Sequence, residues 1–449
     1  MDSTSAQQQS APAQVTLAQA FVYWLKLGFV SFGGPAGQIA IMHHDLVEKK
    51  RWISDKRFLH ALNYCMVLPG PEAQQLATYI GWLMHRTWGG IIAGTLFVLP
   101  SFFILLALAW IYMTYGSVPA VAGALYGIKP AVVAIVLFAC YRIGSRTLKN
   151  PLLYAISVLA FIAIFIFRLP FPAIVLAAAL VGYFGGRYSP KLFKAGGGHG
   201  AAQKNFGPAL IDDDTPTPAH ALFSWGRLMR ICMIGAGIWA AAMMVLISLY
   251  GWDSAFTQMG WFFTKAALLT FGGAYAVLPY VYQGAVEHYQ WLTPVQMIDG
   301  LALGETTPGP LIMVITFVGF VGGWVKQIFG VDAVFASAFI AAAIATFFTF
   351  LPSFIFIFMG GPFIETTHGN LKLTAPLTAI TAAVVGVIAS LALFFAYHVF
   401  WPGGLDHAAD GFSIALAAAA TLAIFRFKAG VISVILGCGI AGMAWRLLA

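Results

Sequence analysis

Apolar runs long enough to cross a lipid bilayer recur along almost the whole sequence. A spanning helix needs roughly 20 residues, and the chain provides many such stretches. Only 9% of the 449 residues are charged, whereas a soluble domain carries about a quarter. The pattern predicts an all-α polytopic membrane protein, with apolar runs at Gly89–Tyr112, Val118–Tyr141, Leu152–Phe167, Phe171–Phe184, Ile231–Leu249, Val331–Met359, Leu373–Tyr397, Phe412–Phe425 and Val431–Trp445.

Two tripeptides occur twice in a single register. Phe32-Gly33-Gly34 recurs 239 residues later as Phe271-Gly272-Gly273, and Pro69-Gly70-Pro71 recurs at the same offset as Pro308-Gly309-Pro310. Motifs that keep one spacing over this distance indicate a duplication. We therefore predict that the chain consists of two diverged copies of one unit.

A third repeated motif extends the duplication beyond these tripeptides. Leu99-Pro100-Ser101-Phe102 matches Leu351-Pro352-Ser353-Phe354 at an offset of 252 residues, so the second copy has 13 additional residues before it. The predicted organisation is a polar, disordered tail at 1–15, a first repeat at 16–186, a cytoplasmic linker at 187–226, a linking transmembrane helix at 227–254 and a second repeat at 255–449. The linker is rich in Gly, Pro and charge, and we expect it to be solvated, without a packed core.

The charge of equivalent loops predicts that the two copies have inverted topology. The first copy carries Lys49, Lys50, Arg51, Lys56 and Arg57 between its two motifs, whereas the equivalent stretch 287–296 has no Lys or Arg. Basic residues collect in short cytoplasmic loops, so these two loops should lie on opposite sides of the membrane. An odd number of crossings in the linking segment would produce that inversion, which is a common plan for secondary transporters.

The glycine and proline motifs are predicted to break helices within the membrane. The segments on either side of Pro69-Gly70-Pro71 are each too short to span a bilayer, which predicts a re-entrant hairpin that returns Arg86 to the cytoplasmic side. The same argument favours a bend at Phe32-Gly33-Gly34; a straight first span is the alternative.

Such breaks are candidates for an anion-binding site at the middle of the membrane. A restarted helix presents free N–H groups and the positive end of its dipole, and freed backbone groups at this depth must be buried in protein or line a wet cavity. Close packing through small residues is the competing explanation. The candidate substrate-binding residues at the breaks are Gly33, Gly34, Pro69, Gly70, Pro71, Gln75, Gly272, Gly273, Thr307, Pro308, Gly309 and Pro310.

Charged residues near the motifs provide further candidates. Lys26 and Lys265 are equivalent and precede their Phe-Gly-Gly motifs by six residues, which would suit an anionic substrate if both face a shared cavity. Snorkelling to the membrane surface is the alternative for these lysines. Glu72 and Glu305 lie beside the Pro-Gly-Pro motifs and are candidates for proton coupling, against a plain capping or packing role.

The residues at these motifs resemble the long-chain chromate ion transporter (CHR) family. The resemblance rests on the stretches that begin at Phe32, Leu68 and Glu305, and it runs from about Phe21 to the C-terminus. It implies a multi-pass protein of the bacterial inner membrane that exports chromate, binds sulfate as a competing oxyanion and confers chromate resistance. The family's signature positions carry over to Phe32, Gly33, Gly34, Pro35, Gly37, Gln38, Pro69, Gly70, Pro71, Glu72, Gln75 and Tyr79, and to Phe271, Gly272, Gly273, Thr307, Pro308, Gly309 and Pro310.

The expected partners are chromate, sulfate or protons, and the lipid bilayer, and the chain could also form a homodimer. We expect no nucleic-acid partner, cofactor, metal site or catalytic residue, because the basic residues lie in short loops and the four cysteines are scattered. Three alternatives stay open: a transporter of sulfate or another oxyanion, a membrane enzyme that reduces chromate, and a lipid-handling protein.

Export is the favourable direction for a dianion. Moving one charge through the membrane potential is worth about 2.3 kcal/mol per 100 mV, and moving a dianion is worth twice that.

Overall fold

The computed structural model describes residues 12–193, 206–271, 273–366 and 374–448, and their regular structure is helical apart from one isolated β-bridge between Ile53 and Ile211. Within the described residues, each apolar run identified in the sequence falls on a helix to within two residues at its ends, and seven helices are long and apolar enough to cross a membrane. The prediction of an all-α polytopic membrane protein is therefore confirmed. The tail predicted at 1–15 falls mostly on residues 1–11, which lie outside the described residues, as does Gly272.

The order of helices repeats along the chain. The first copy contains α1 (Leu17–Val30), α2 (Gly34–His43), the π-helical turn η1 (His44–Lys49), α3 (Asp55–Cys65), α4 (Glu72–Tyr115), α5 (Pro119–Thr147), α6 (Pro151–Phe165) and α7 (Phe171–Tyr188). After α8 (Trp225–Tyr250), the second copy contains α9 (Ala255–Leu268), α10 (Ala274–Tyr282), the π-helical turn η3 (Gln283–His288), α11 (Pro294–Thr306), α12 (Val314–Lys326), α13 (Val334–Thr366), α14 (Thr374–Phe400), α15 (Gly411–Phe425) and α16 (Val431–Leu448). The unusual π-helical turns lie 239 residues apart, which is the offset of the sequence motifs.

Helix α4 consists of two antiparallel limbs. Its backbone leaves the helical conformation at His85 and Arg86, where Arg86 has φ of 57°. Glycines allow the limbs to approach closely: a side chain at Gly89 would overlap the carbonyl of Gly81, and one at Gly94 would overlap the side chain of Thr78. The limb Glu72–Met84 therefore leads back from Pro69-Gly70-Pro71 to the turn at Arg86, as the re-entrant hairpin requires.

The second copy builds the same hairpin from two separate helices. Helix α12 ends before Gln327, which has a left-handed backbone with φ of 46°. Gly319 and Gly323 of α12 then pack directly against the backbone of α13. The close approach through small residues reproduces the packing inside α4 and is typical of helix pairs in membranes.

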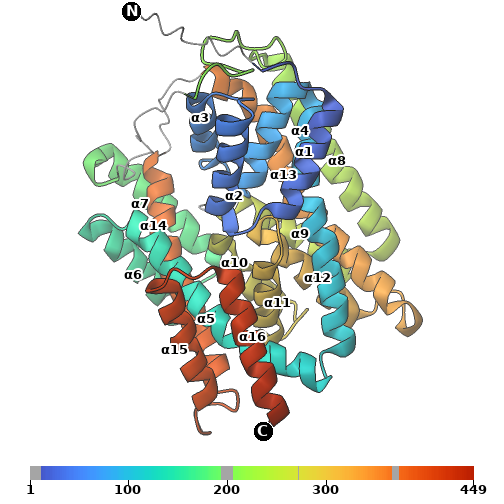
Figure 1. The fold of residues 1–449 in the computed structure, drawn as a ribbon, viewed down its shortest axis with the longest axis vertical. Coiled ribbons are helices and arrows are strands. Elements are labelled where there is room, and N and C mark those ends of the chain that lie inside the picture. Colours follow the sequence, from blue (N-terminus) through green and yellow to red (C-terminus); the bar gives the residue numbers. More distant parts are fainter. Residues whose placement is uncertain (1–11, 194–205, 272, 367–373, 449) are drawn as a thin grey trace, which may run out of the picture.

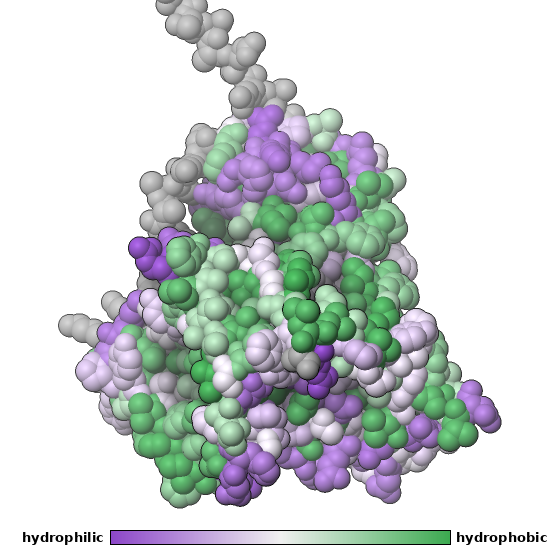
Figure 2. Space-filling view, turned by 60° about the horizontal axis from the view of Figure 1, so that its bottom comes forward, coloured by the Kyte–Doolittle hydropathy of each residue, from purple (hydrophilic) through white to green (hydrophobic). Residues whose placement is uncertain are grey.

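The two sets of short helices lie in different parts of the molecule. In Figure 1, α1, α2 and α3 lie near the top, α10 and α11 lie below them, and α15 and α16 are at the bottom. Figure 2 shows hydrophobic residues across the middle of the visible face, with hydrophilic residues gathered above them and along the lower edge. This surface fits a lipid-facing zone between two aqueous sides, and the inverted orientation of the copies in the bilayer stays a prediction.

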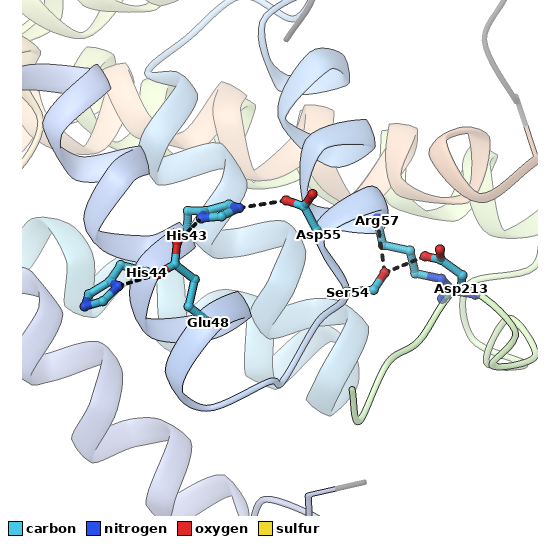
Figure 3. Close-up of polar contacts among 7 residues, drawn as sticks. All are labelled: His43, His44, Glu48, Ser54, Asp55, Arg57 and Asp213. Carbon is cyan, nitrogen blue, oxygen red and sulfur yellow. Dashed lines mark hydrogen bonds and ion pairs between the residues drawn. The ribbon is translucent and has the colours of Figure 1, made fainter. Parts of the chain in front are cut away.

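The described part of the linker is packed against the first copy, contrary to our expectation of a solvated segment without a core. Ile211 and Ala221 are 7% and 0% exposed, and both belong to the hydrophobic cluster around α1, α3 and α4. Figure 3 shows the polar contacts at this interface, where Ser54 Oγ donates to Asp213 Oδ1 at 2.6 Å. Arg57 also donates to the carbonyl oxygen of Thr215.

We expect Arg57→Ala to loosen the linker, since it removes a hydrogen bond from a charged donor, worth about 1.5–3 kcal/mol. Limited proteolysis with chymotrypsin, which can cut after Phe206 and Leu210, should become roughly tenfold faster or more at these sites. Lys56→Ala is the matched control, because Lys56 is exposed and makes no hydrogen bond within the described residues. Equal cleavage rates in the two variants would contradict this assignment.

Candidate functional site

Both Phe-Gly-Gly motifs break their helices, and glycine makes the breaks possible. Helix α1 ends at Val30, and Gly33 and Gly34 have φ of 88° and 68°. In the second copy α9 ends at Leu268, and Gly273 has φ of 96°. This left-handed region is strained for residues with a Cβ atom, so glycine is the residue best suited to these positions.

Each Pro-Gly-Pro tip is bonded to the other copy. The Gly70 amide donates to the carbonyl oxygen of Thr270 at 2.8 Å, and the Gly309 amide donates to the carbonyl oxygen of Ser31 at 2.7 Å. Ser31 and Thr270 are equivalent residues, each directly before its Phe-Gly-Gly motif. The crossed pair of hydrogen bonds brings all four motifs together, and we call this region, with the side chains described next, the crossed junction.

A serine from the long helix of the opposite copy packs against each tip. A Cβ atom at Gly70 would overlap Ser353 Oγ, and a Cβ atom at Gly309 would lie 2.8 Å from Ser101 Cβ. Ser101 and Ser353 belong to the repeated Leu-Pro-Ser-Phe motif and are themselves equivalent. The junction is therefore pseudo-symmetric at the level of individual side chains.

The two serine hydroxyls are buried without a partner. Ser101 and Ser353 are 0% and 1% exposed, and neither Oγ atom forms a hydrogen bond with any described residue. A buried polar group left unpaired costs about 1–3 kcal/mol. Two equivalent unpaired hydroxyls at one junction indicate a place where a ligand or water supplies the missing partner.

Two buried glutamines complete the junction. Gln38 Nε2 donates to the carbonyl oxygens of Ser31 and Gly309, and Gln75 Nε2 donates to the carbonyl oxygen of Pro69 at 2.7 Å. The Oε1 atoms of both side chains lack a partner among the described residues. One glutamine therefore braces each tip, although the two are not equivalent in register.

The junction combines helix dipoles with unpaired hydroxyls. Helices α2 and α4 begin there without a side-chain cap, and α10 begins in the same way after Gly273. Free N–H groups at such termini and the unpaired serine hydroxyls can donate to oxyanion oxygens. None of the residues assigned to the crossed junction is Lys or Arg. The described residues contain no group of three or more His, Cys, Asp or Glu arranged so that it could hold a metal ion.

Comparison with known proteins assigns the chain to a family. The chromate transporter family model matches residues 18–183 and again 257–443. The chain belongs to the chromate transporter family. A chromate transport protein from Pseudomonas aeruginosa is 32% identical, over 98% of this chain and 95% of that protein. A chromate transport protein from Cupriavidus metallidurans is 30% identical, over 88% of this chain and 86% of that protein. A probable chromate transport protein from Synechococcus elongatus is 28% identical over 83% of each chain. No solved structure matches this member of the family.

The two lysines of this chromate transporter family member are not gathered at the junction. Lys26 is exposed on α1 in the same row as Val22 and Phe29, which are 66% and 51% exposed and suit contact with lipid. Lys265 is partly buried and lies 5.4 Å over the Trp261 ring. It lines a cavity of about 730 Å³ together with Arg168, and Lys26 is not among the residues of that cavity. The structure thus does not place both lysines on one shared cavity, and their role as substrate ligands stays a prediction.

The remaining candidates lie around the tips. Glu72 is in the first turn of α4, and Glu305 in α11 accepts a hydrogen bond from Tyr275 Oη. Thr307 is buried and donates to the Gly304 carbonyl at 2.9 Å, so its hydroxyl is already used. Pro71 and Pro310 immediately precede the helical turns that restart after the tips. Pro69 and Pro308 begin the same two motifs.

Ser101 and Ser353 were not among the residues selected from the sequence. Their signal was present in the duplicated Leu-Pro-Ser-Phe motif, which was used to establish the register of the repeat. Nothing in that motif indicates that its hydroxyls face the tips of the opposite copy. Only the packing of α4 and α13 against those tips identifies them.

Proposed function

We propose that this protein exports chromate across the bacterial inner membrane as a secondary transporter and thereby confers chromate resistance. Membership of the chromate transporter family and the 30–32% identity to two chromate transport proteins support the substrate. The membrane potential supports the direction, because an outward-moving dianion gains about twice 2.3 kcal/mol per 100 mV. No chemical transformation of the substrate is part of the proposal.

The observation that carries the site assignment is the pair of unpaired serine hydroxyls at the crossed junction. Chromate is a tetrahedral dianion with four acceptor oxygens, so it needs donors on several sides. The Ser101 and Ser353 hydroxyls and the uncapped starts of α2, α4 and α10 supply donors from both copies. We propose that the substrate binds between the copies, near Gly33, Gly70, Gly273 and Gly309, and that relative motion of the copies exposes it to alternate sides.

Everted membrane vesicles provide the test of export. With an inside-positive potential, vesicles that contain the protein should accumulate labelled chromate, and dissipating the potential should abolish most of that uptake. Vesicles from cells with an empty vector are the control. Absence of protein-dependent uptake under the imposed potential would refute export.

Sulfate is the alternative substrate, and the geometry provides a reason to test it. Helix termini and hydroxyls recognise tetrahedral oxyanions through hydrogen bonds and do not distinguish dianions of similar size. We expect excess sulfate to reduce labelled chromate uptake in the same vesicles. Uptake that is unchanged by sulfate would exclude a shared site, while preferred uptake of labelled sulfate would reassign the substrate.

The acidic candidate in the first turn of α4 gives a further prediction. Glu72 places a carboxylate in the first turn of α4, where it competes with an incoming anion for the helix N-terminus. We expect Glu72→Gln to raise chromate affinity at neutral pH by roughly two- to fivefold, as removal of one dipole-bound charge is worth about 0.3–1 kcal/mol. The KM for chromate uptake into the vesicles measures this affinity. Glu48→Gln, in the distant turn η1, is the control. A KM that rises in Glu72→Gln would contradict competition between Glu72 and the anion.

A further inference from the structure

A buried acid–base cluster joins three helices of the transporter and includes none of the residues selected from the sequence. Asp299 of α11 is 2% exposed. Its Oδ2 atom accepts a hydrogen bond from Tyr112 Oη at 3.0 Å and lies 3.7 Å from Lys129 Nζ. Tyr112 comes from the second limb of α4 and Lys129 from α5. The cluster therefore connects a short helix of the second copy with two long helices of the first.

One oxygen of this carboxylate is left without a partner. Asp299 Oδ1 is buried and forms no hydrogen bond within the described part of the chain. A buried ion pair overcomes its desolvation cost only when its remaining lone pairs are also satisfied. The cluster is thus poorly arranged as a static brace, and it has a vacant acceptor at which a proton can bind.

The position of Asp299 links it to the crossed junction. Helix α11 runs from Pro294 to Thr306 and leads directly into the Pro308-Gly309-Pro310 tip. Asp299 lies seven residues before the end of this helix, or about 10 Å at 1.5 Å per residue. A change in the charge of Asp299 therefore acts on the same short helix that carries the tip.

The groups that face Asp299 are few. Its electrostatic partners are Lys129 and Tyr112. Helices α12, α14 and α16 also pack on α11, and they contribute no electrostatic partner of Asp299 within the described residues. Lys129 is partly exposed, with 24% of its side chain accessible, whereas only 3% of the Asp299 side chain is accessible.

We propose that Asp299 is the proton-binding residue of the transport cycle, and this inference rests on the proposed chromate transport. A proton from water binds Oδ1 and forms an O–H bond, which neutralises the carboxylate and removes its attraction for Lys129. The freed positive charge of Lys129 then favours the oxyanion in the transport pathway. Proton and oxyanion therefore bind together and leave together, and each dianion crosses the membrane with about one proton. The net charge moved is then one, so the membrane potential still favours export, by half as much as for the dianion alone.

The test uses the purified full-length protein in liposomes loaded with labelled chromate and a trapped pH-sensitive dye. A mildly alkaline buffer keeps chromate as the dianion, and a potassium ionophore holds the potential at zero. In the wild type, chromate efflux should raise the internal pH. Asp299→Asn should lose this pH change while chromate–chromate exchange, which requires only the loaded protein, continues close to the wild-type rate.

Two further variants keep the result decisive. The double variant Asp299→Asn with Lys129→Met removes both charges, so it leaves no unpaired buried ion to destabilise the fold. Because it also removes the positive charge that favours the oxyanion, it should exchange chromate with a raised KM and without moving protons. Asp410→Asn is the matched control, because Asp410 also accepts a tyrosine hydrogen bond, from Tyr126 at 2.6 Å, but lies at the start of α15. It should retain wild-type proton movement.

The outcomes separate the inference from the function on which it rests. Proton movement that persists in either Asp299 variant, or a wild type that transports chromate with no proton movement, overturns the inference and leaves chromate transport intact. Loss of exchange in both Asp299 variants assigns the cluster a structural role and also overturns it. A wild type with neither efflux nor exchange overturns the proposed function instead.

Discussion

Gly70→Ala is expected to abolish chromate transport. Gly70 has φ of 127°, a conformation that costs a residue with a Cβ atom about 1–3 kcal/mol. The added methyl group would also overlap Ser353 Oγ and lie 2.6 Å from Gln75 Nε2. The tip must then move away from Thr270, which breaks the hydrogen bond that joins the two copies. Uptake into everted vesicles measures the loss.

The equivalent variant and a matched control define what a loss of uptake means. Gly309→Ala should have the same effect, because Gly309 has φ of 97° and faces Ser101 in the same way. Gly237→Ala is the control, since Gly237 lies inside α8 and a Cβ atom there meets nothing within 4 Å. Size-exclusion chromatography in detergent would report the amount of folded protein. Normal transport by Gly70→Ala would rule out the crossed junction as a site that requires close packing.

Ser353→Ala and Ser101→Ala are expected to weaken chromate binding without weakening the fold. Each hydroxyl is buried and unpaired in the described structure, so its removal eliminates no internal hydrogen bond and should leave the thermal stability unchanged or raise it. A hydrogen bond to a charged ligand is worth about 1.5–3 kcal/mol, so each variant should raise the KM for chromate roughly 10- to 100-fold. The combination of retained stability and lost affinity distinguishes a ligand-binding hydroxyl from a structural one.

Thr349→Ala provides the comparison within the same helix. Thr349 is also buried in α13, one turn before Ser353, but its hydroxyl donates to the Ala345 carbonyl at 2.7 Å. Its removal should lower thermal stability slightly and leave the KM for chromate unchanged. If Ser353→Ala and Thr349→Ala behave alike in both measurements, the serine hydroxyls do not contact the substrate.

Much of the fold could be predicted from the sequence because its signals are local. Long apolar runs indicate membrane helices wherever they occur, and Gly33, Gly34 and the proline tips indicate breaks because their backbone preferences are intrinsic. The 239-residue offset even extends to the π-helical turns η1 and η3, which no propensity rule would have placed. The packing of Ile211 and Ala221 was not predictable, since an isolated apolar residue in a polar segment does not show which surface covers it.

The sequence by itself determined that this chain is a duplicated helical membrane protein whose helices break at four motifs. It also identified the family, because those motifs are long and contiguous. Only the tertiary structure decided that the tip of each copy bonds to the other copy, that Ser101 and Ser353 face these tips, and that Asp299 meets Lys129 and Tyr112. The physical reason is distance along the chain. Spacing and composition report the conformation of a segment, whereas contacts between residues more than a hundred positions apart depend on how whole helices pack.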